Sequence, residues 1–290
     1  MLKPIIKKHL LKHPKLKNYI DKLRWNNHVL SDLCNTYFFR TKKEYKTPFG
    51  FSLVSRNYRA NRLMLNGTFE LEELEIIKKQ ILTADVFIDV GANIGYYSCL
   101  AQKLSKHVVA FEPQIQNLEC LYTSLEINGW SDFEIFPVGL SDTPGLVTLY
   151  GASGPSASLI KGWAGYSERF KKAIPVNTMD NVLNDRFVGK KLFIKIDVEG
   201  AEYNVLKGAV KILNMVPKPT WFIEICLSEF HPGSGNPNFA ETFNLFIQNG
   251  YEIRIADEDT TLITETDIKR WVTDGNTNIN NFNYLFIPIE

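Results

Sequence analysis

The chain has 290 residues, of which 44% are hydrophobic, and a formal net charge of +1 at pH 7. A charge this close to zero argues against a general attraction to nucleic acid, and no run approaches the roughly 18 apolar residues of a membrane span. The length fits one large α/β domain plus an extension.

The first 33 residues form a Lys-rich amphipathic segment, which Pro14 divides into two predicted short helices. Residues 1–24 carry eight Lys or Arg residues and one acid. Two interpretations remain open: the helices pack on the rest of the protein, or their basic face contacts a membrane surface or an anionic partner. We expect a cytoplasmic protein, because no secretory cleavage pattern follows and the four cysteines show no C-x-x-C pairing.

Further along, the pattern predicts strands that alternate with helices. One or two short strands, or a hairpin, are expected within residues 49–66, and a helix over 70–82. The strands then expected are 86–90, 107–112, 133–138, 192–197, 221–225, 251–256 and 284–289, and the helices 94–105, 115–128, 202–213 and 239–249. This alternation is typical of a parallel sheet with helical crossovers.

The alternation breaks between the third and fourth of these strands. Gly151–Ser158 is rich in small residues, and Trp163, Tyr166 and Phe170 follow among basic side chains. Such a segment is either a lid or flap over a binding site, or a surface hairpin.

The first strand of the alternation leads into a glycine-rich turn. It ends at Asp89 and Val90, and Gly91, Asn93 and Gly95 then lead into a helical pattern. A strand, a glycine turn and a helix start in this order indicate a nucleotide-type cofactor site, because the turn lets the backbone approach a ligand closely.

The next strand supplies an acid, Glu112, which stands 21 residues after Gly91. A carboxylate at this place can accept hydrogen bonds from both ribose hydroxyls of an adenosine. The turn lacks the G-x-G-x-x-G pattern that admits a pyrophosphate, and no triphosphate-binding G-x-x-x-x-G-K-[ST] occurs. A cofactor with adenosine and no phosphate fits better, and S-adenosylmethionine (SAM) is the obvious candidate.

The fourth strand gives the third motif. It ends at Asp197, and two further acids, Glu199 and Glu202, precede or begin a helix. Together with Asp89–Ser98 and the run Ala110-Phe-Glu-Pro113, this motif resembles the FkbM-type family of SAM-dependent methyltransferases, over roughly residues 49–224.

The resemblance implies a Rossmann-like class I methyltransferase fold. This α/β fold has a central, mostly parallel seven-stranded sheet with helices on both faces. The chain would comprise a basic extension, 1–45, and a methyltransferase domain, 46–290, with its SAM-binding core at about 84–226. The implied reaction is methyl transfer from SAM to a hydroxyl of a sugar, glycan or related polyol.

Several residues are expected to bind the cofactor. By resemblance, Gly91, Asn93 and Gly95 border the methionine part of SAM, and Asn93 binds its carboxylate. Asp89 is expected to bond a loop amide, or the methionine amino group through water, unless it only caps the next helix. Ser141 and Asp142, after the third strand, are expected to reach the adenine, although turn formation alone also favours this pair.

A hydroxyl acceptor must lose its proton, so a side chain within hydrogen-bond reach is expected to assist. The candidates for this catalytic role are Asp197, His231 and Glu224, and Glu199 is a further acid nearby. The same carboxylates, with Glu202, would suit Mg²⁺; we expect no resident metal.

Two other functions compete with O-methylation. A methyltransferase-like scaffold that partners a glycosyltransferase is one, and the basic N-terminal segment would then provide the contact. A nucleic-acid methyltransferase is the other. It is disfavoured because base amino-methylation commonly uses [DNS]-P-P-[YFW] at the strand end, where this chain has Asp197-Val-Glu-Gly200.

Overall fold

The computed structural model describes residues 41–57, 61–151, 156–165, 171–279 and 281–289. Most of the predicted basic extension therefore lies outside the described residues. Within those ranges, no helix is both long and apolar enough to cross a membrane.

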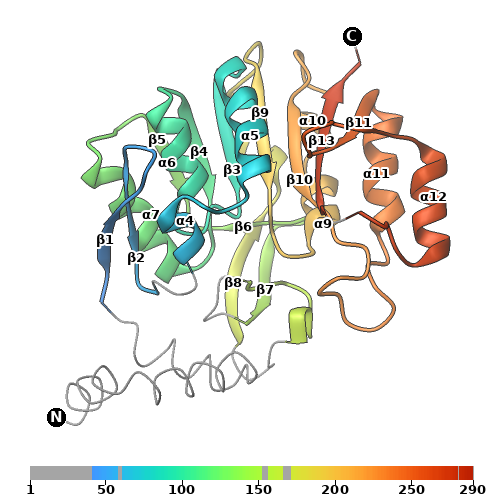
Figure 1. Ribbon diagram of the computed structural model, residues 1–290, viewed down its shortest axis with the longest axis horizontal. Coiled ribbons are helices and arrows are strands. Elements are labelled where there is room, and N and C mark those ends of the chain that lie inside the picture. The colour runs from blue at the N-terminus through green and yellow to red at the C-terminus, as the bar shows by residue number, and fades with distance from the viewer. Residues whose placement is uncertain (1–40, 58–60, 152–155, 166–170, 280, 290) are drawn as a thin grey trace.

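A mixed sheet forms the centre of the fold (Figure 1), with the order β12, β11, β13, β10, β9, β3, β4, β5. Its strands are β3 (Val86–Val90), β4 (His107–Phe111), β5 (Phe133–Phe136), β9 (Leu192–Ile196), β10 (Thr220–Glu224), β11 (Tyr251–Ile255), β12 (Leu262–Ile263) and β13 (Asn283–Pro288).

The sheet is mostly parallel, as predicted. Strands β5, β4, β3, β9 and β10 pair in parallel. Strand β13 runs antiparallel between β10 and β11, which restores the common direction in β11. Within the described residues the main sheet has eight strands where the sequence predicts seven, because the two-residue β12 pairs with the outer edge of β11.

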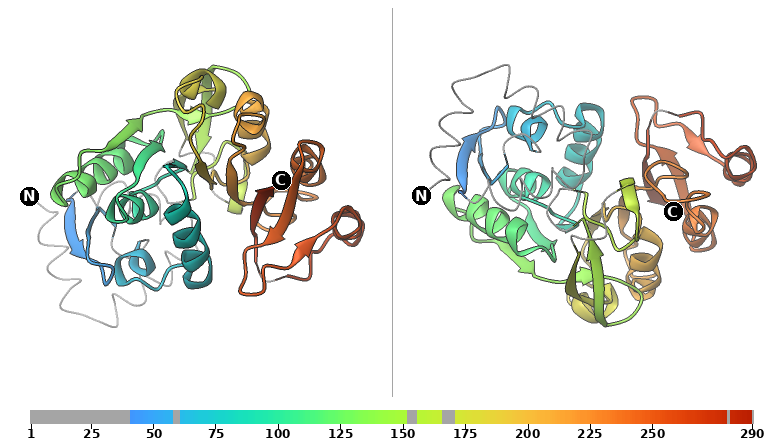
Figure 2. Two further views of the ribbon diagram at one scale, coloured as in Figure 1. Left: turned by 90° about the horizontal axis from the view of Figure 1, so that it is seen from above. Right: turned by 90° about the horizontal axis from the view of Figure 1, so that it is seen from below.

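Helices cover both faces of the sheet (Figure 2). Side chains alternate along a strand, so Val86, Ile88 and Val90 enter one apolar core and Phe87 enters the other. The first core includes residues of α8 (Met179–Leu183), α9 (Glu202–Lys207), α10 (Val210–Leu213), α11 (Phe239–Gln248) and α12 (Glu265–Asp274). The second includes residues of α4 (Arg62–Asn66), α5 (Leu71–Thr83), α6 (Tyr96–Lys103) and α7 (Ile115–Ile127).

The segment before the main sheet differs partly from its prediction. A hairpin of β1 (Lys43–Lys46) and β2 (Ser52–Ser55) is present, but residues 62–66 form helix α4 instead of a strand. The hairpin is anchored on α7, where the Asn128 side chain bonds both the N–H and the carbonyl of Ser52 at 2.9 and 2.8 Å. The predicted helix 202–213 is also interrupted, since α9 ends at Gly208 and α10 follows.

The break after β5 contains a second, smaller sheet (Figure 1), made of β6 (Gly139–Leu140), β7 (Gly145–Tyr150) and β8 (Lys171–Asn177). Strands β7 and β8 form an antiparallel hairpin. Between them, residues 156–165 include a short turn of helix, η1 (Trp163–Gly165). Of the two alternatives, the hairpin is therefore present, and a lid or flap over a binding site stays a prediction.

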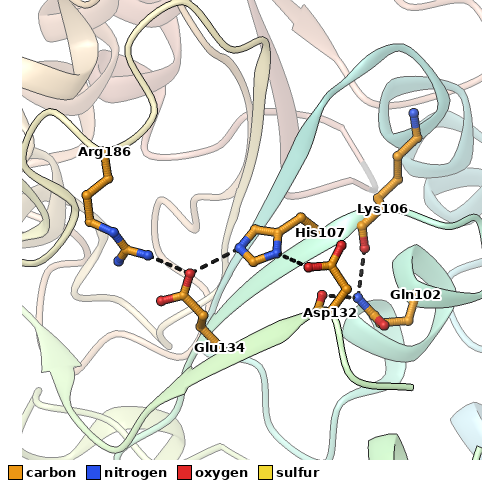
Figure 3. Close-up of polar contacts among 6 residues, drawn as sticks. All are labelled: Gln102, Lys106, His107, Asp132, Glu134 and Arg186. Carbon is orange, nitrogen blue, oxygen red and sulfur yellow. Dashed lines mark hydrogen bonds and ion pairs between the residues drawn. The ribbon is translucent and has the colours of Figure 1, made fainter. Parts of the chain in front are cut away.

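Polar contacts join β4 and β5 at the amino-terminal end of β4 (Figure 3). The two ring nitrogens of His107 face Asp132 Oδ1 at 2.7 Å and Glu134 Oε1 at 3.1 Å. Arg186 approaches the same Glu134 oxygen at 2.5 Å. This network lies at the strand end opposite to the acids of the predicted site, so we interpret it as structural.

The fold predicts a difference between two glycine substitutions. Gly95 and Gly129 have φ of +88° and +74°, so either Gly→Ala change adds left-handed strain of about 1–2 kcal/mol. A Cβ at Gly95 would also lie 2.4 Å from Cδ1 of the buried Leu121, whereas one at Gly129 meets nothing within 4 Å. Overpacking should cost Gly95→Ala about 1–3 kcal/mol more, measured by urea unfolding followed through tryptophan fluorescence. Equal losses would contradict this packing.

Candidate active site

A pocket opens where β3, β4 and β9 end, and it encloses about 680 Å³ of space not filled by atoms, open solvent included. We call it the donor pocket. Its polar lining includes Gly91, Asn93, Glu112, Asp197 and Glu199. The structure thus brings together the three strand ends that carry the sequence motifs.

Glu112 is held at the pocket by its own backbone surroundings. Its carboxyl group accepts hydrogen bonds from the backbone N–H of Asn93 at 2.9 Å and of Gln114 at 2.7 Å. Only 4% of the residue is exposed, and burial raises its pKa to about 7 although these hydrogen bonds favour the charged form. The group is fixed in place and keeps lone pairs for a ligand.

Gly91 of the glycine turn lines the pocket, and close packing explains why this residue is a glycine. Gly91 has φ +85°, and a Cβ there would lie 1.9 Å from the carbonyl oxygen of Asp197. The turns after β3 and β9 can therefore approach each other only because residue 91 is glycine. Asn93 also has a positive φ, of 52°.

Four predicted cofactor residues are absent from the pocket lining. Asp89 is buried and accepts a hydrogen bond from Ser98 Oγ at 2.6 Å, and Gly95 packs on α7. Ser141 is buried beside the pocket loop, and Asp142 pairs with Lys207 at 3.0 Å, which lowers the pKa of that carboxyl. The pocket lining from this loop is instead Val138, Gly139 and Leu140. Direct contacts of these four residues with a cofactor remain predictions.

A buried lysine organises the acids beside the pocket. Lys195 is 4% exposed and lies directly opposite Asp89 in the β3–β9 pairing. Its ammonium bonds Asp197 Oδ2 at 3.0 Å and lies 5.0 Å from the ring centre of Tyr97. Burial alone would lower the pKa of this ammonium, but Asp197, Glu70 and Asp89 reverse the effect and raise it. Lys195 therefore stays charged.

Glu70 is a site residue that the sequence did not reveal. It immediately precedes α5 with a left-handed φ of 44°, and it accepts a hydrogen bond from the Tyr97 hydroxyl at 2.5 Å. Burial raises its pKa to about 7, with Lys195 opposing the shift and Asp197 adding to it. Glu70 lies outside the three motifs, so no spacing rule connects it to them.

The remaining acids differ in their surroundings. Glu202 accepts the N–H of Gly200 at 2.9 Å and so stabilises the turn, and Glu199 accepts the Trp163 indole N–H at 2.8 Å. The pKa values of Glu199 and Glu224 are both raised. Burial is the larger cause, and the nearby charge of Asp197 is the second. Across the described ranges, no group of three or more His, Cys, Asp or Glu side chains is arranged to hold a metal ion.

His231 lies apart from the donor pocket, in the loop after β10. Its ring packs edge-on against Trp163, with 4.7 Å between ring centres. Burial lowers the pKa of the imidazole, and Nε2 is buried without a hydrogen-bond partner among the described residues. The donor-pocket lining therefore includes Asp197 but not His231, although the sequence proposed both as the base.

Comparisons with known proteins point to one family. The profile of the FkbM methyltransferase domain matches residues 89–253. A curated relative, hexuronic acid methyltransferase AglP of Haloferax volcanii, is 28% identical over 149 residues, which cover 51% of this chain and 59% of that protein.

Solved structures with a similar fold are more distant in sequence. A TehB-like SAM-dependent methyltransferase from Corynebacterium glutamicum has a TM-score of 0.43 at 9% identity, covering 80% of this chain and 95% of that one. A SAM-dependent methyltransferase from Agrobacterium tumefaciens has a TM-score of 0.41 at 8% identity, covering 86% and 70%.

The geometry of Glu112 predicts the effect of its removal. Glu112→Ala should weaken SAM binding by about 1–3 kcal/mol, because hydrogen bonds to a charged acceptor are lost together with the anchor of the Asn93 and Gln114 amides. Titration calorimetry measures the affinity. Glu126→Ala, at an exposed position on α7, is the matched control. A folded Glu112→Ala protein with wild-type affinity would contradict the assignment.

Proposed function

The chain belongs to the FkbM family of methyltransferases, and on that premise we propose that it is a SAM-dependent O-methyltransferase whose acceptor is a hydroxyl of a sugar, glycan or related polyol. Family membership rests on the match to residues 89–253. The hexuronic acid methyltransferase supports a sugar-type acceptor. The chain spans 59% of the length of that relative, so the acceptor is part of the proposal.

The donor pocket fits the cofactor in its residues and their chemistry. Glu112 would accept the ribose hydroxyls, and Gly91 and Asn93 would border the methionine part. The apolar side chains of Val138 and Leu140 would cover the adenine. Bound SAM supplies an already activated methyl group, so positioning accounts for much of the rate enhancement.

The acids beside the donor pocket favour a neutral hydroxyl over a carboxylate acceptor, and this observation carries the O-methylation proposal. Four carboxyl groups influence one another here: Glu70, Asp197, Glu199 and Glu224. The described residues place the single ammonium of Lys195 among them. A carboxylate acceptor would add charge to a cluster whose raised pKa values already reflect burial and the mutual repulsion of its acids, which is unfavourable. A hydroxyl adds no charge and can donate its proton to an ionised carboxylate of the cluster.

Asp197 is the candidate base best placed to contact this hydroxyl. Of the three candidates, Asp197 alone lines the donor pocket, while Glu224 lies beside it and His231 lies apart. Lys195 fixes the Asp197 carboxylate by an ion pair. Burial raises the pKa of Glu70 to about 7 and also raises that of Glu224, so the ionised form of either carboxyl group is a strong proton acceptor beside Asp197.

Transfer of labelled methyl groups tests the proposal. The protein is incubated with labelled SAM and glycan extracts of the source cell, and we expect label on a sugar or polyol. A catalytically inactive scaffold would show no binding heat with SAM and no label transfer. Label found in nucleic acid would overturn the acceptor class.

Substitution and pH together test the base. Asp197→Asn should lower turnover about 10²–10⁴-fold, the usual contribution of a general base, and should also disturb SAM binding. The wild-type rate should rise with pH around 7, because Glu70 becomes an ionised acceptor there. Glu70→Gln should flatten this rise. Steady-state rates across pH measure both effects.

His231 gives a different pH signature. Only a neutral imidazole accepts a proton, and burial lowers the pKa of His231. A rate that depends on His231 as the base would therefore increase with pH through a transition that lies below about pH 6.5. If His231→Ala loses this low-pH transition and turns over about 10²-fold more slowly, the general base is His231 and not Asp197. EDTA is the companion control: activity lost on chelation and restored by Mg²⁺ would favour a metal-assisted hydroxyl.

A further inference from the structure

A second cavity adjoins the donor pocket, with about 890 Å³ of empty space. It lies between the start of α9 and the loop of residues 231–238, and we call it the polar groove. Leu159 and Ala201 line both the donor pocket and the polar groove. The donor pocket and the polar groove therefore lie side by side along these two residues.

The described residues that line the polar groove include polar side chains but no Lys, Arg, Asp or Glu. Its amide and hydroxyl groups come from Tyr203, Asn204, Ser234 and Asn238, among others. These four side chains are at least partly exposed, and none makes a hydrogen bond within the described part of the chain. The groove thus offers unused donors and acceptors to a ligand without net charge.

His231 adds a buried polar atom to this wall. Its Nε2 has no hydrogen-bond partner in the described ranges, although the ring is fixed edge-on by Trp163. A buried polar atom without a partner is unfavourable, and a ligand hydroxyl that bonds it would remove this penalty. The ring of Tyr203 and the prolines 232 and 237 provide apolar surface for the faces of sugar rings.

We propose that the polar groove binds the uncharged saccharide units next to the sugar that receives the methyl group. The inference rests on the proposed function and specifies its substrate as an oligosaccharide. Amides and hydroxyls match the hydroxyls of sugars, and the absence of charged side chains from this lining disfavours anionic chains. The shared wall at Leu159 and Ala201 joins this subsite to the reacting centre.

The test uses the full chain saturated with S-adenosylhomocysteine, titrated with maltotriose, cellotriose and chitotriose and observed by NMR of the asparagine side-chain amides. We expect at least one trisaccharide to shift the Asn204 and Asn238 signals. Ser234→Trp, at an exposed position, should block the groove and weaken this binding on the order of tenfold, equivalent to two lost hydrogen bonds. Ser131→Trp, exposed before β5, is the matched control and should leave binding unchanged.

Three results would overturn the proposal: no shift with any of the three sugars, equal binding in Ser234→Trp and wild type, or tighter binding of a uronic acid trisaccharide. If Ser234→Trp fails to bind S-adenosylhomocysteine, Asn204→Ala replaces it and should weaken binding several-fold. Failure of the proposed function has a different result: the wild type would neither bind SAM nor transfer label, but the trisaccharides could still bind in the groove.

Discussion

One buried ammonium sets the electrostatics of this protein. Lys195 lies in the middle of the sheet, where an isolated charge would be costly, and Asp197, Glu70 and Asp89 compensate it. Burial, and after it the charges of neighbouring acids, raises the pKa of Glu70 to about 7 and raises that of Glu224. The balance of charge thus links the packing of the sheet to a site that can accept a proton.

Three of the nine described non-glycine residues with positive φ belong to the same region. Glu70, Asn93 and Glu199 all have positive φ values, of 44°, 52° and 57°, which non-glycine residues rarely adopt. Each precedes a helix, and each contributes a group to the donor pocket or to the acids beside it. Strained residues of this kind persist where surrounding contacts over-determine them, commonly at functional sites. The hydrogen bond from Tyr97 to Glu70 and that from Trp163 to Glu199 are such contacts.

Sequence reasoning found what depends on local pattern. The strands of the main sheet and the acids at their ends follow from apolar runs that end in Asp89, Glu112 and Asp197. The helix over 62–66 was mistaken for a strand because five residues show no helical period. Helix α12 was missed, although the capping box of Thr264 and Asp267 is a readable signal. Glu70 and the polar groove depend on tertiary contacts between distant segments, which spacing does not encode.

The central claim is that the acid-rich site takes a proton from a neutral hydroxyl and does not methylate a carboxylate. The chemical stability of the labelled product tests it most directly, because mild alkali cleaves a methyl ester and leaves a methyl ether intact. The account predicts that the label stays on the sugar after alkali treatment. Release of the label as methanol would identify a carboxylate acceptor, which needs no base, and would contradict the account.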